Sequence, residues 1–424
     1  MHRWPGLARV CACGGLVCLA LLAGLGALLG AASWTARPVA FLAAGWAGFA
    51  LVAVAALRLS CVPGRRWRVT MAWLAALSAL GAGAVLWPDA GIAPPKLLPG
   101  THWVALPGGA RLAYLELPAA RPAHATPVIF LHGGPGMADM GGDAIYLRRL
   151  AADGYNVYLY DQLGVGESSR LANPARYTVA ASVANLESFR KAIHAPHVDL
   201  IGYSWGSALA AAYLASHARH VAKVVFVSPG AVGGQANDLL ELLGRLGPAH
   251  LWALLRQTLA PRAVLAWMLV QVNPRAAHAF AGDAEMDARF RDMIAAFAPA
   301  FYCHPPARTS GGQPGFYALA MLLRRQAWRG VDPHAALRRL ATPALILKGQ
   351  CDYLSWASAV DYRDTLRNAR LVYVPNAGHR LFAERPRAFA ATVSAFLDGL
   401  PLPLAAMTQT SPPPGYDGPA GTVR

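Results

Sequence analysis

The sequence predicts an α/β domain built on a mainly parallel sheet, preceded by apolar helices that cross a membrane. Two observations predict this combination. Of the 424 residues, 55% are hydrophobic and only 14% are charged, whereas about a quarter of the residues in ordinary soluble domains are charged. From residue 101 onward, short apolar runs typical of buried strands alternate with helical patterns.

Residues 1–95 are predicted to form a membrane region. Three stretches with almost no charge are each long enough to cross a bilayer core as a helix, which takes about 20 apolar residues. A cleaved signal peptide is the alternative for the first stretch, because Arg3 and Arg9 give it a basic start. The predicted transmembrane helices, with the lipid bilayer as their partner, span about 11–31, 38–58 and 69–88.

Positive charge predicts the orientation of these helices. The loop between the second and third spans carries Arg58, Arg65, Arg66 and Arg68, whereas the loop between the first two carries Arg37 alone. Because short loops rich in arginine stay in the cytoplasm, everything after residue 88 is expected on the outer face. We therefore expect a multi-pass protein of a bacterial inner membrane with its folded domain in the periplasm.

Charge and cysteine usage argue against two classes of protein. The net charge of +16 is spread along the chain, so no nucleic-acid partner is expected. Only Cys303 and Cys351 of the six cysteines fall in the outer domain, which is no disulfide framework and no metal site. These two could pair in an oxidising compartment, but we expect buried free thiols.

Residues 96–400 are predicted to form the α/β domain. Its strand-like runs include PVIFL, YNVYLY, VDLI, VVFV, PALILKG and LVYV. Residues 231–340 lack such runs and predict a helical cap, either a lid over a site or a structural appendage. Residues 401–424 are rich in proline and glycine and are predicted to be disordered.

The strongest local signal for chemistry is Gly202-Tyr203-Ser204-Trp205-Gly206. It follows the apolar run VDLI and precedes an alanine-rich helix, the context of a nucleophilic serine on a tight strand-to-helix turn. The glycines let the backbone turn without a Cβ clash, and the helix N-terminus favours the oxyanion that forms when serine attacks a carbonyl. Ser204 is therefore the predicted nucleophile.

A serine nucleophile needs an acid and then a histidine at later strand ends. Asp352 follows PALILKG and His379 follows LVYVPNAG, in that order. We predict that His379, on an exposed loop, is the general base and that Asp352 orients it. Asp361 and Asp364 on the next helix are the rivals of Asp352 and are expected to be solvated.

A glycine loop after an early strand predicts the second donor to the oxyanion. His132-Gly133-Gly134-Pro135-Gly136 follows PVIFL, and glycine allows a backbone N–H to approach the substrate closely. We assign the oxyanion hole to the backbone N–H groups of Gly134 and Trp205. A mere tight turn is the alternative. This chemistry needs no cofactor and no metal.

Three motifs together resemble a known family. HGGPG, then Asp161 to Ser168 (DQLGVGES), then GYSWG, are similar to the motifs of the proline iminopeptidase branch of the α/β-hydrolases. The resemblance covers roughly residues 100–400. It implies an α/β-hydrolase fold of about eight strands with helices on both faces, a helical cap, and the three catalytic residues above.

This sequence departs from the motifs of the branch at two positions. Leu163 stands where the branch usually has arginine, and Tyr203 replaces a glycine. Leucine cannot supply the donors of a guanidinium, so ion pairing behind the oxyanion loop must differ. Peptidases of the branch also hold the substrate amine with acidic cap residues. Here the candidates are expected to be exposed helix charges: Glu241, Asp283, Glu285 and Asp287.

Three functions remain open. The resemblance implies an aminopeptidase that acts on a small-molecule or peptide substrate through an acyl-enzyme. The membrane helices and the apolar cap favour an esterase or lipase-like hydrolase of acyl esters or lactones. A non-catalytic membrane-binding protein is the distant alternative, because the nucleophile, acid and base stand in the required order.

Overall fold

A computed structural model describes most of the chain, and the described residues divide into two compact units. Unit 1 comprises Met1–Ile92, Ala172–Pro174 and Thr258–Glu285, and unit 2 comprises Ala93–Leu171, Ala175–Gln257 and Met286–Arg424. The described residues are 5–59, 72, 75–76, 78–83, 85, 97–121, 124–234, 238–306 and 312–422.

Unit 1 is built around two long apolar helices, α1 (Pro5–Trp34) and α2 (Pro38–Leu59). Glycines let them approach closely, because a Cβ on Gly24 would lie 2.9 Å from Phe49 Cβ. The helices α9 (Pro261–Val272) and α10 (Pro274–Phe280) belong to the same unit. Between them, Asn273 Nδ2 donates to the carbonyl of Ala32 at 2.8 Å. Part of the predicted cap therefore clusters with the apolar helices.

Two of the predicted spans correspond to helices of unit 1. Among the described residues, Gly15–Trp34 and Pro38–Ala55 are long and apolar enough to cross a membrane. A signal sequence near the N-terminus would pass the same test. The third predicted span, 69–88, lies largely outside the described residues and stays a prediction.

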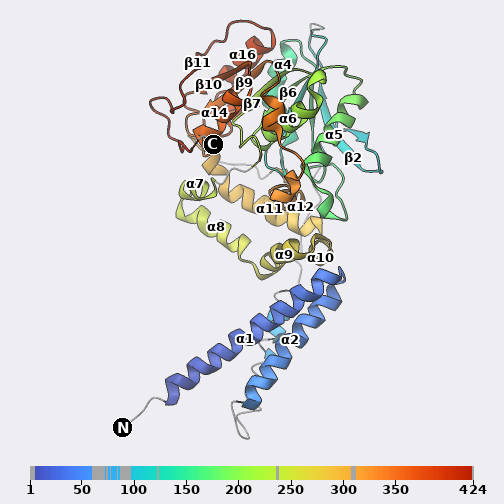
Figure 1. The fold of residues 1–424 in the computed structure, drawn as a ribbon, viewed down its shortest axis with the longest axis vertical. Helices are drawn as coiled ribbons and strands as arrows, with labels where there is room; N and C mark the ends of the chain where they lie inside the picture. Colours follow the sequence, from blue (N-terminus) through green and yellow to red (C-terminus); the bar gives the residue numbers. More distant parts are fainter. Residues whose placement is uncertain are drawn as a thin grey trace. The chain divides into compact units, whose positions relative to one another are not determined.

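Unit 2 contains a nine-stranded sheet with helices on both faces (Figure 1). Its middle strands, from β5 to β10, are parallel, and antiparallel strands close both edges. Parallel strands need crossover connections, which the helices supply. The order across the sheet is β1 (His102–Ala105), β2 (Arg111–Leu117), β5 (Val157–Tyr160), β3 (Val128–Leu131), β6 (Val198–Tyr203), β7 (Val221–Val227), β9 (Ala344–Gly349), β10 (Ala369–Val374) and β11 (Ala406–Met407).

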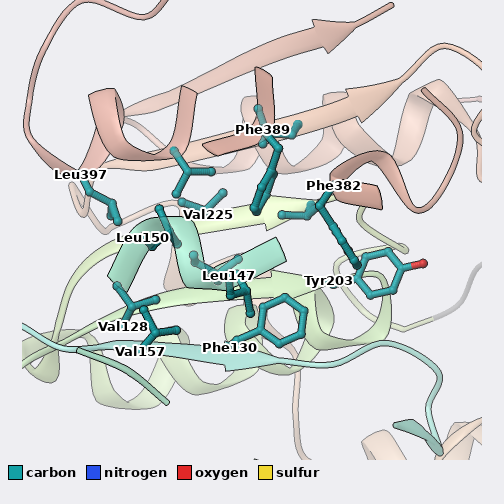
Figure 2. Packing of buried hydrophobic residues seen from close by; sticks show 14 of the residues in the cluster. Val128, Phe130, Leu147, Leu150, Val157, Tyr203, Val225, Phe382, Phe389 and Leu397 are labelled. Atoms are coloured by element: carbon teal, nitrogen blue, oxygen red, sulfur yellow. The ribbon is translucent and has the colours of Figure 1, made fainter. Parts of the chain in front are cut away.

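The central strands are apolar throughout because both faces are buried. Figure 2 shows one face, where α4 (Met140–Ala152) and α16 (Pro386–Leu397) cover residues such as Phe130 and Val225. Successive side chains of a strand point to opposite faces. The opposite face therefore contacts the remaining helices, as Tyr160 on Phe189 and Phe226 on Tyr362 show. These helices are α5 (Val179–Ala192), α6 (Trp205–His217) and α14 (Trp356–Thr365).

The predicted cap is mostly helical, with one short strand that the sequence did not predict. Within it, β8 (Gln313–Pro314) pairs with β4 (Met137–Ala138), which follows the glycine loop after β3. This pairing joins the cap to that loop. The cap helices of unit 2 are α7 (Leu239–Gly244), α8 (Pro248–Thr258), most of α11 (Asp283–Phe297), the 3₁₀ turns η3 (Ala298–Phe301) and η4 (Arg325–Trp328), α12 (Phe316–Leu322) and α13 (Pro333–Leu337).

The C-terminal tail differs from its prediction of disorder. Strand β11 pairs with β10, the backbone N–H of Asp417 donates to the Gln350 carbonyl at 3.0 Å, and that of Trp356 donates to the Pro419 carbonyl at 2.8 Å. The sheet edge and the loop after β9 offer backbone groups that pair with the segment. Its side chains contribute as well, because Leu402 and Leu404 pack against the core and Tyr416 lies against the ring of Trp356.

Cys303 and Cys351 form a disulfide, so the expectation of free thiols was wrong. The two residues are 48 positions apart in the sequence. Only the tertiary fold brings the end of the cap, just after η3, to the loop after β9.

Removal of this disulfide is expected to lower the stability of unit 2. Closing a loop of 48 residues restricts the unfolded chain by about 4 kcal/mol in the chain-entropy model. A Cys303→Ser/Cys351→Ser variant should therefore show a lower Tm in thermal denaturation, and reductant should lower the Tm of the wild type in the same way. Cys18→Ser, which removes an exposed free cysteine, is the control. An unchanged Tm in the double variant would contradict the prediction.

Candidate active site

Ser204 lies in the tight turn between β6 and α6. Its backbone has φ 54° and ψ −116°, a strained conformation for a residue with a side chain. A Cβ on Gly202 would lie 2.5 Å from the Gly206 carbonyl oxygen, and one on Gly206 would collide with the Leu131 carbonyl oxygen. Both positions require glycine, as predicted, and Ser204 is held at the N-terminus of α6.

The structure brings the three predicted side chains together. His379 Nε2 lies 2.9 Å from Ser204 Oγ, and His379 Nδ1 lies 2.8 Å from Asp352 Oδ1. An ionised carboxylate only accepts, so Nδ1–H donates to Asp352 and Nε2 is free to accept from the serine hydroxyl. The residues follow β6, β9 and β10, whose carboxyl ends meet at one edge of the sheet.

The surroundings of His379 differ from the expectation of an exposed loop. The residue is only 2% exposed, and its imidazole packs against the rings of Tyr203, Phe301 and Tyr353, with centroids 4.6–5.6 Å away. The rival acids lie elsewhere. Asp361 contacts His334 at 3.1 Å and Asp364 contacts Arg363 at 2.7 Å.

The glycine loop after β3 lies against Ser204. A Cβ on Gly133 would lie 3.2 Å from Ser204 Cβ, and both Gly133 and Gly134 line the cavity that contains Ser204. His132 fixes this loop, because its Nδ1 donates to the Gly133 carbonyl at 2.9 Å and its Nε2 accepts from the Gln162 backbone at 3.0 Å. Burial lowers the pKa of His132 to about 4, so its ring is neutral at pH 7.

Gln162 connects the three motifs. Its side-chain amide donates to the His132 carbonyl at 3.1 Å and accepts from Trp205 Nε1 at 3.0 Å. Behind it, Arg170 supports the loop of Leu163, since its guanidinium donates to the carbonyls of Gly166 and Ser168 and pairs with Asp287. A guanidinium is therefore present near the loop, but it comes from another position than in the family motif.

The cavity above Ser204 contains charged residues that the sequence analysis missed. It has a volume of about 60 Å³, and Asp139, Asp143 and Arg380 line it. Arg380 lies 2.7 Å from Asp143 and 3.6 Å from Asp139. Burial raises the pKa of Asp143 to about 7, although Arg380 opposes the shift. The signal available in the sequence was their position: Asp139 and Asp143 follow the glycine loop, and Arg380 follows His379 directly.

Another side wall of the cavity is apolar. Met137 and Ala138 from β4 and Ile294, Ala298 and Phe301 from the cap contribute to it. The cavity therefore combines a charged wall with one suited to an aliphatic group.

The four acidic cap residues are not exposed, unpaired charges. Glu285 and Asp287 are each 7% exposed and pair with Arg262 at 2.6 Å and Arg170 at 2.9 Å, so the expectation of exposure was wrong for both. Asp283 contacts His278 at 2.7 Å, and Glu241 contacts Arg245 at 2.9 Å. Three of the four partners lie in the cap itself, and Arg170 comes from the loop after the second motif. None of the four lines the cavity of Ser204.

Lys348 is a further residue that the sequence analysis overlooked. It lies on β9, is fully buried, and its Nζ is 2.8 Å from Asp352 Oδ2. A lysine inside an otherwise apolar strand run, four residues before the predicted acid, was the signal.

Comparison with known proteins places this geometry in a family. Residues 126–386 match the family described as alpha/beta hydrolase fold. This chain belongs to the α/β-hydrolases. It is similar to the proline iminopeptidase of Levilactobacillus brevis, with 27% identity over 64% of this chain and 88% of the relative. The proline iminopeptidase of Heyndrickxia coagulans is 41% identical over 104 residues, but the match spans only 35% of that relative and 24% of this chain.

Solved structures agree with the fold. An esterase from Exiguobacterium antarcticum superposes with a TM-score of 0.50 and 18% identity, over 70% of this chain and 98% of that one. A bromoperoxidase from Bacillus anthracis gives the same TM-score and identity over 70% and 99%. The α/β-hydrolase fold and its family are thus shown.

Asp161, in the second motif, is expected to make this hydrolase less stable as pH rises. Burial raises its pKa to about 7, against a donated hydrogen bond from the Glu167 backbone. Between about pH 4 and 7 the unfolded chain loses this proton and the folded protein keeps it, so stability falls. Asp161→Asn cannot ionise. Relative to wild type, its free energy of unfolding should increase from pH 5 to 8, by about 3 kcal/mol at most.

Urea denaturation at several pH values measures this difference. Any change in stability that the amide itself causes is the same at every pH. The test therefore depends only on how the difference in free energy of unfolding between the two proteins changes with pH. Parallel curves for the two proteins would contradict the prediction.

Proposed function

We propose that this α/β-hydrolase is a serine hydrolase with Ser204 as nucleophile, His379 as general base and Asp352 as the acid that orients the imidazole. The unbroken chain of hydrogen bonds from Ser204 Oγ through His379 to Asp352 Oδ1 carries the proposal. The strained turn at Ser204 supports it further, because such strain is typical of nucleophiles in this fold.

The proposed reaction proceeds through an acyl-enzyme. His379 Nε2 accepts the proton of Ser204 as Oγ attacks the carbonyl carbon of the substrate. The backbone N–H groups of Gly134 and Trp205 donate to the resulting oxyanion, and the N-terminus of α6 adds a favourable field. His379 then gives the proton to the departing amine or alcohol. Water repeats the sequence and releases the acid.

For the acyl group, we propose an amino acid with a free amine, so that the enzyme is an aminopeptidase. The similarity to proline iminopeptidases supports this. In the cavity, Asp139 and Asp143 lie beside one guanidinium, that of Arg380. Above pH 7, where Asp143 is ionised, the three groups carry a formal charge of −1 that attracts an ammonium group. Asp139 is the better candidate for it, since its distance to Arg380 is the longer.

An esterase is the second candidate. Asp143 is already paired with Arg380, and the apolar wall formed by Ile294, Ala298 and Phe301 would accept an uncharged acyl chain. A non-catalytic protein that only binds at a membrane is the remaining alternative.

The nucleophile is tested with a fluorophosphonate probe. Wild-type protein should be labelled covalently at Ser204, because His379 removes the hydroxyl proton during attack on phosphorus. Ser204→Ala should not be labelled, whereas Ser207→Ala, which changes a neighbouring buried serine, should be. Labelling that persists in Ser204→Ala would contradict the assignment of Ser204 as the nucleophile. A wild-type protein that is never labelled would favour the non-catalytic alternative.

The acyl preference is tested with a prolyl naphthylamide and a naphthyl acetate. An aminopeptidase should cleave the amide at a rate comparable to the ester. Asp139→Asn keeps a side-chain acceptor for the Gly142 backbone N–H, to which Asp139 Oδ1 lies 3.2 Å away, but loses the charge. It should raise KM for the amide about tenfold and leave the ester unchanged. Cleavage of the ester alone would decide for the esterase.

We also propose that the apolar N-terminal helices anchor the enzyme in a membrane, with the hydrolase domain in the periplasm. The excess of arginine in the second loop supports the orientation, and the disulfide in unit 2 suits an oxidising compartment.

Reporter fusions test the topology. Alkaline phosphatase, which needs the periplasm, should be active when fused after residue 100, and a cytoplasmic reporter at the same point should be inactive. Fusions within the loop at residue 62 should give the opposite result, which serves as the matched control. Activity of only the cytoplasmic reporter after residue 100 would overturn the orientation.

A further inference from the structure

Lys348 is an unusual residue for its place in the sheet. It lies on β9 in the middle of unit 2, and neither its side chain nor that of Asp352 is exposed. Burial of an ammonium group is very unfavourable unless partners compensate it. Its partners are Asp352 Oδ2 and the carbonyl of Leu354, each 2.8 Å from Nζ.

The carboxylate of Asp352 is therefore shared between two side-chain donors, the imidazole of His379 and the ammonium group of Lys348. Its Oδ1 accepts from His379 Nδ1 at 2.8 Å and from the Leu354 backbone at 3.0 Å, and its Oδ2 accepts from Lys348. Ser204, His379, Asp352 and Lys348 thus form one continuous hydrogen-bonded chain. In a triad without such a lysine, the imidazolium that forms during the reaction is the one charged partner of the carboxylate.

We propose that Lys348 is a positioning residue that fixes the carboxylate of Asp352 and weakens the hold of this carboxylate on protonated His379. The inference rests on the proposed serine hydrolase function. Because the ammonium charge lies beyond the carboxylate on the side away from the imidazole, it opposes the arrival of a second positive charge on His379. The carboxylate then stabilises the imidazolium less than it would without Lys348.

The electrostatics of the carboxyl group agree with this arrangement. Burial alone would raise the pKa of Asp352, but the charges of Lys348 and His379 outweigh it and hold the pKa below its ordinary value. Burial lowers the pKa of Lys348, and Asp352 opposes that shift. Other titratable or charged groups surround these hydrogen-bonded residues. On the side of Lys348 and Asp352 they are Asp238, Glu241, Arg245, Tyr353 and Tyr416. On the side of His379 they are Asp143, Tyr203 and Arg380.

The test measures the rate of fluorophosphonate labelling of Ser204 from pH 4 to 9 in the full-length protein. Lys348→Met removes the charge and the donor, and Lys348→Gln removes the charge but keeps a donor. Both should move the midpoint of the acidic limb upward by about one pH unit. Lys348→Gln should retain more of the plateau rate, because it still holds the carboxylate in place.

Lys223→Met is the matched control. Lys223 also lies on a parallel strand, β7, and donates to the carbonyls of Phe396 and Leu397. It has no contact with Ser204, His379 or Asp352. Its pH profile should match that of the wild type. Wild-type midpoints in both Lys348 variants would overturn the inference while leaving Ser204 as the nucleophile. Absence of labelling in the wild type would instead overturn the proposed function.

Lys348→Arg covers the case in which Lys348→Met and Lys348→Gln do not fold, as judged by the loss of a cooperative thermal transition. It keeps a positive charge and donors beside Asp352. The inference therefore expects the midpoint of its acidic labelling limb to match that of the wild type. An upward displacement of this midpoint in Lys348→Arg would overturn the assignment of the effect to the positive charge.

Discussion

Close backbone contact at the carboxyl end of β6 is the constraint on which the rest of the site depends. Gly206 packs on the carbonyl of Leu131, the last residue of β3, and Gly133 packs on Tyr203 and Ser204. These contacts hold the glycine loop against the nucleophile. A side chain at Gly206 would push the two strand ends apart and move the glycine loop, with the proposed oxyanion donor Gly134, away from Ser204.

A second set of contacts holds the histidine loop against the end of the cap. Glu384 accepts hydrogen bonds from the backbones of Cys303, His304 and Gly378, and the disulfide joins the same segment to Cys351. Gly378 has no room for a Cβ beside Phe301. The loops that carry His379 and Asp352 and one wall of the cavity are therefore joined by contacts other than those of the sheet.

How much of the fold and the site could be predicted depends on how far apart in the sequence the interacting residues lie. The turn at Ser204 depends on residues within two positions, and the edge that gathers Asp352 and His379 follows from parallel strands, so sequence alone sufficed for both. Asp139 and Arg380 lie side by side on the charged wall of the cavity although they are 241 positions apart in the sequence, a contact that no local pattern encodes. The pairing of Glu285 with Arg262 and of Cys303 with Cys351 has the same origin. The role of Lys348 could have been inferred from the sequence, because a charged residue in a buried strand needs a partner.

The C-terminal tail shows how a segment with the composition of a linker can hold the loop that carries a site residue. Tyr416 donates to the carbonyl of Leu354 at 3.1 Å, Asp417 binds the backbone of Gln350, and Gly418 fits only because it has no side chain beside the carbonyl of Asp352. Anyone shortening this chain for expression would cut at residue 400, where proline and glycine begin to dominate. Such a cut would open the loop of Asp352, and with it the buried ion pair, to water.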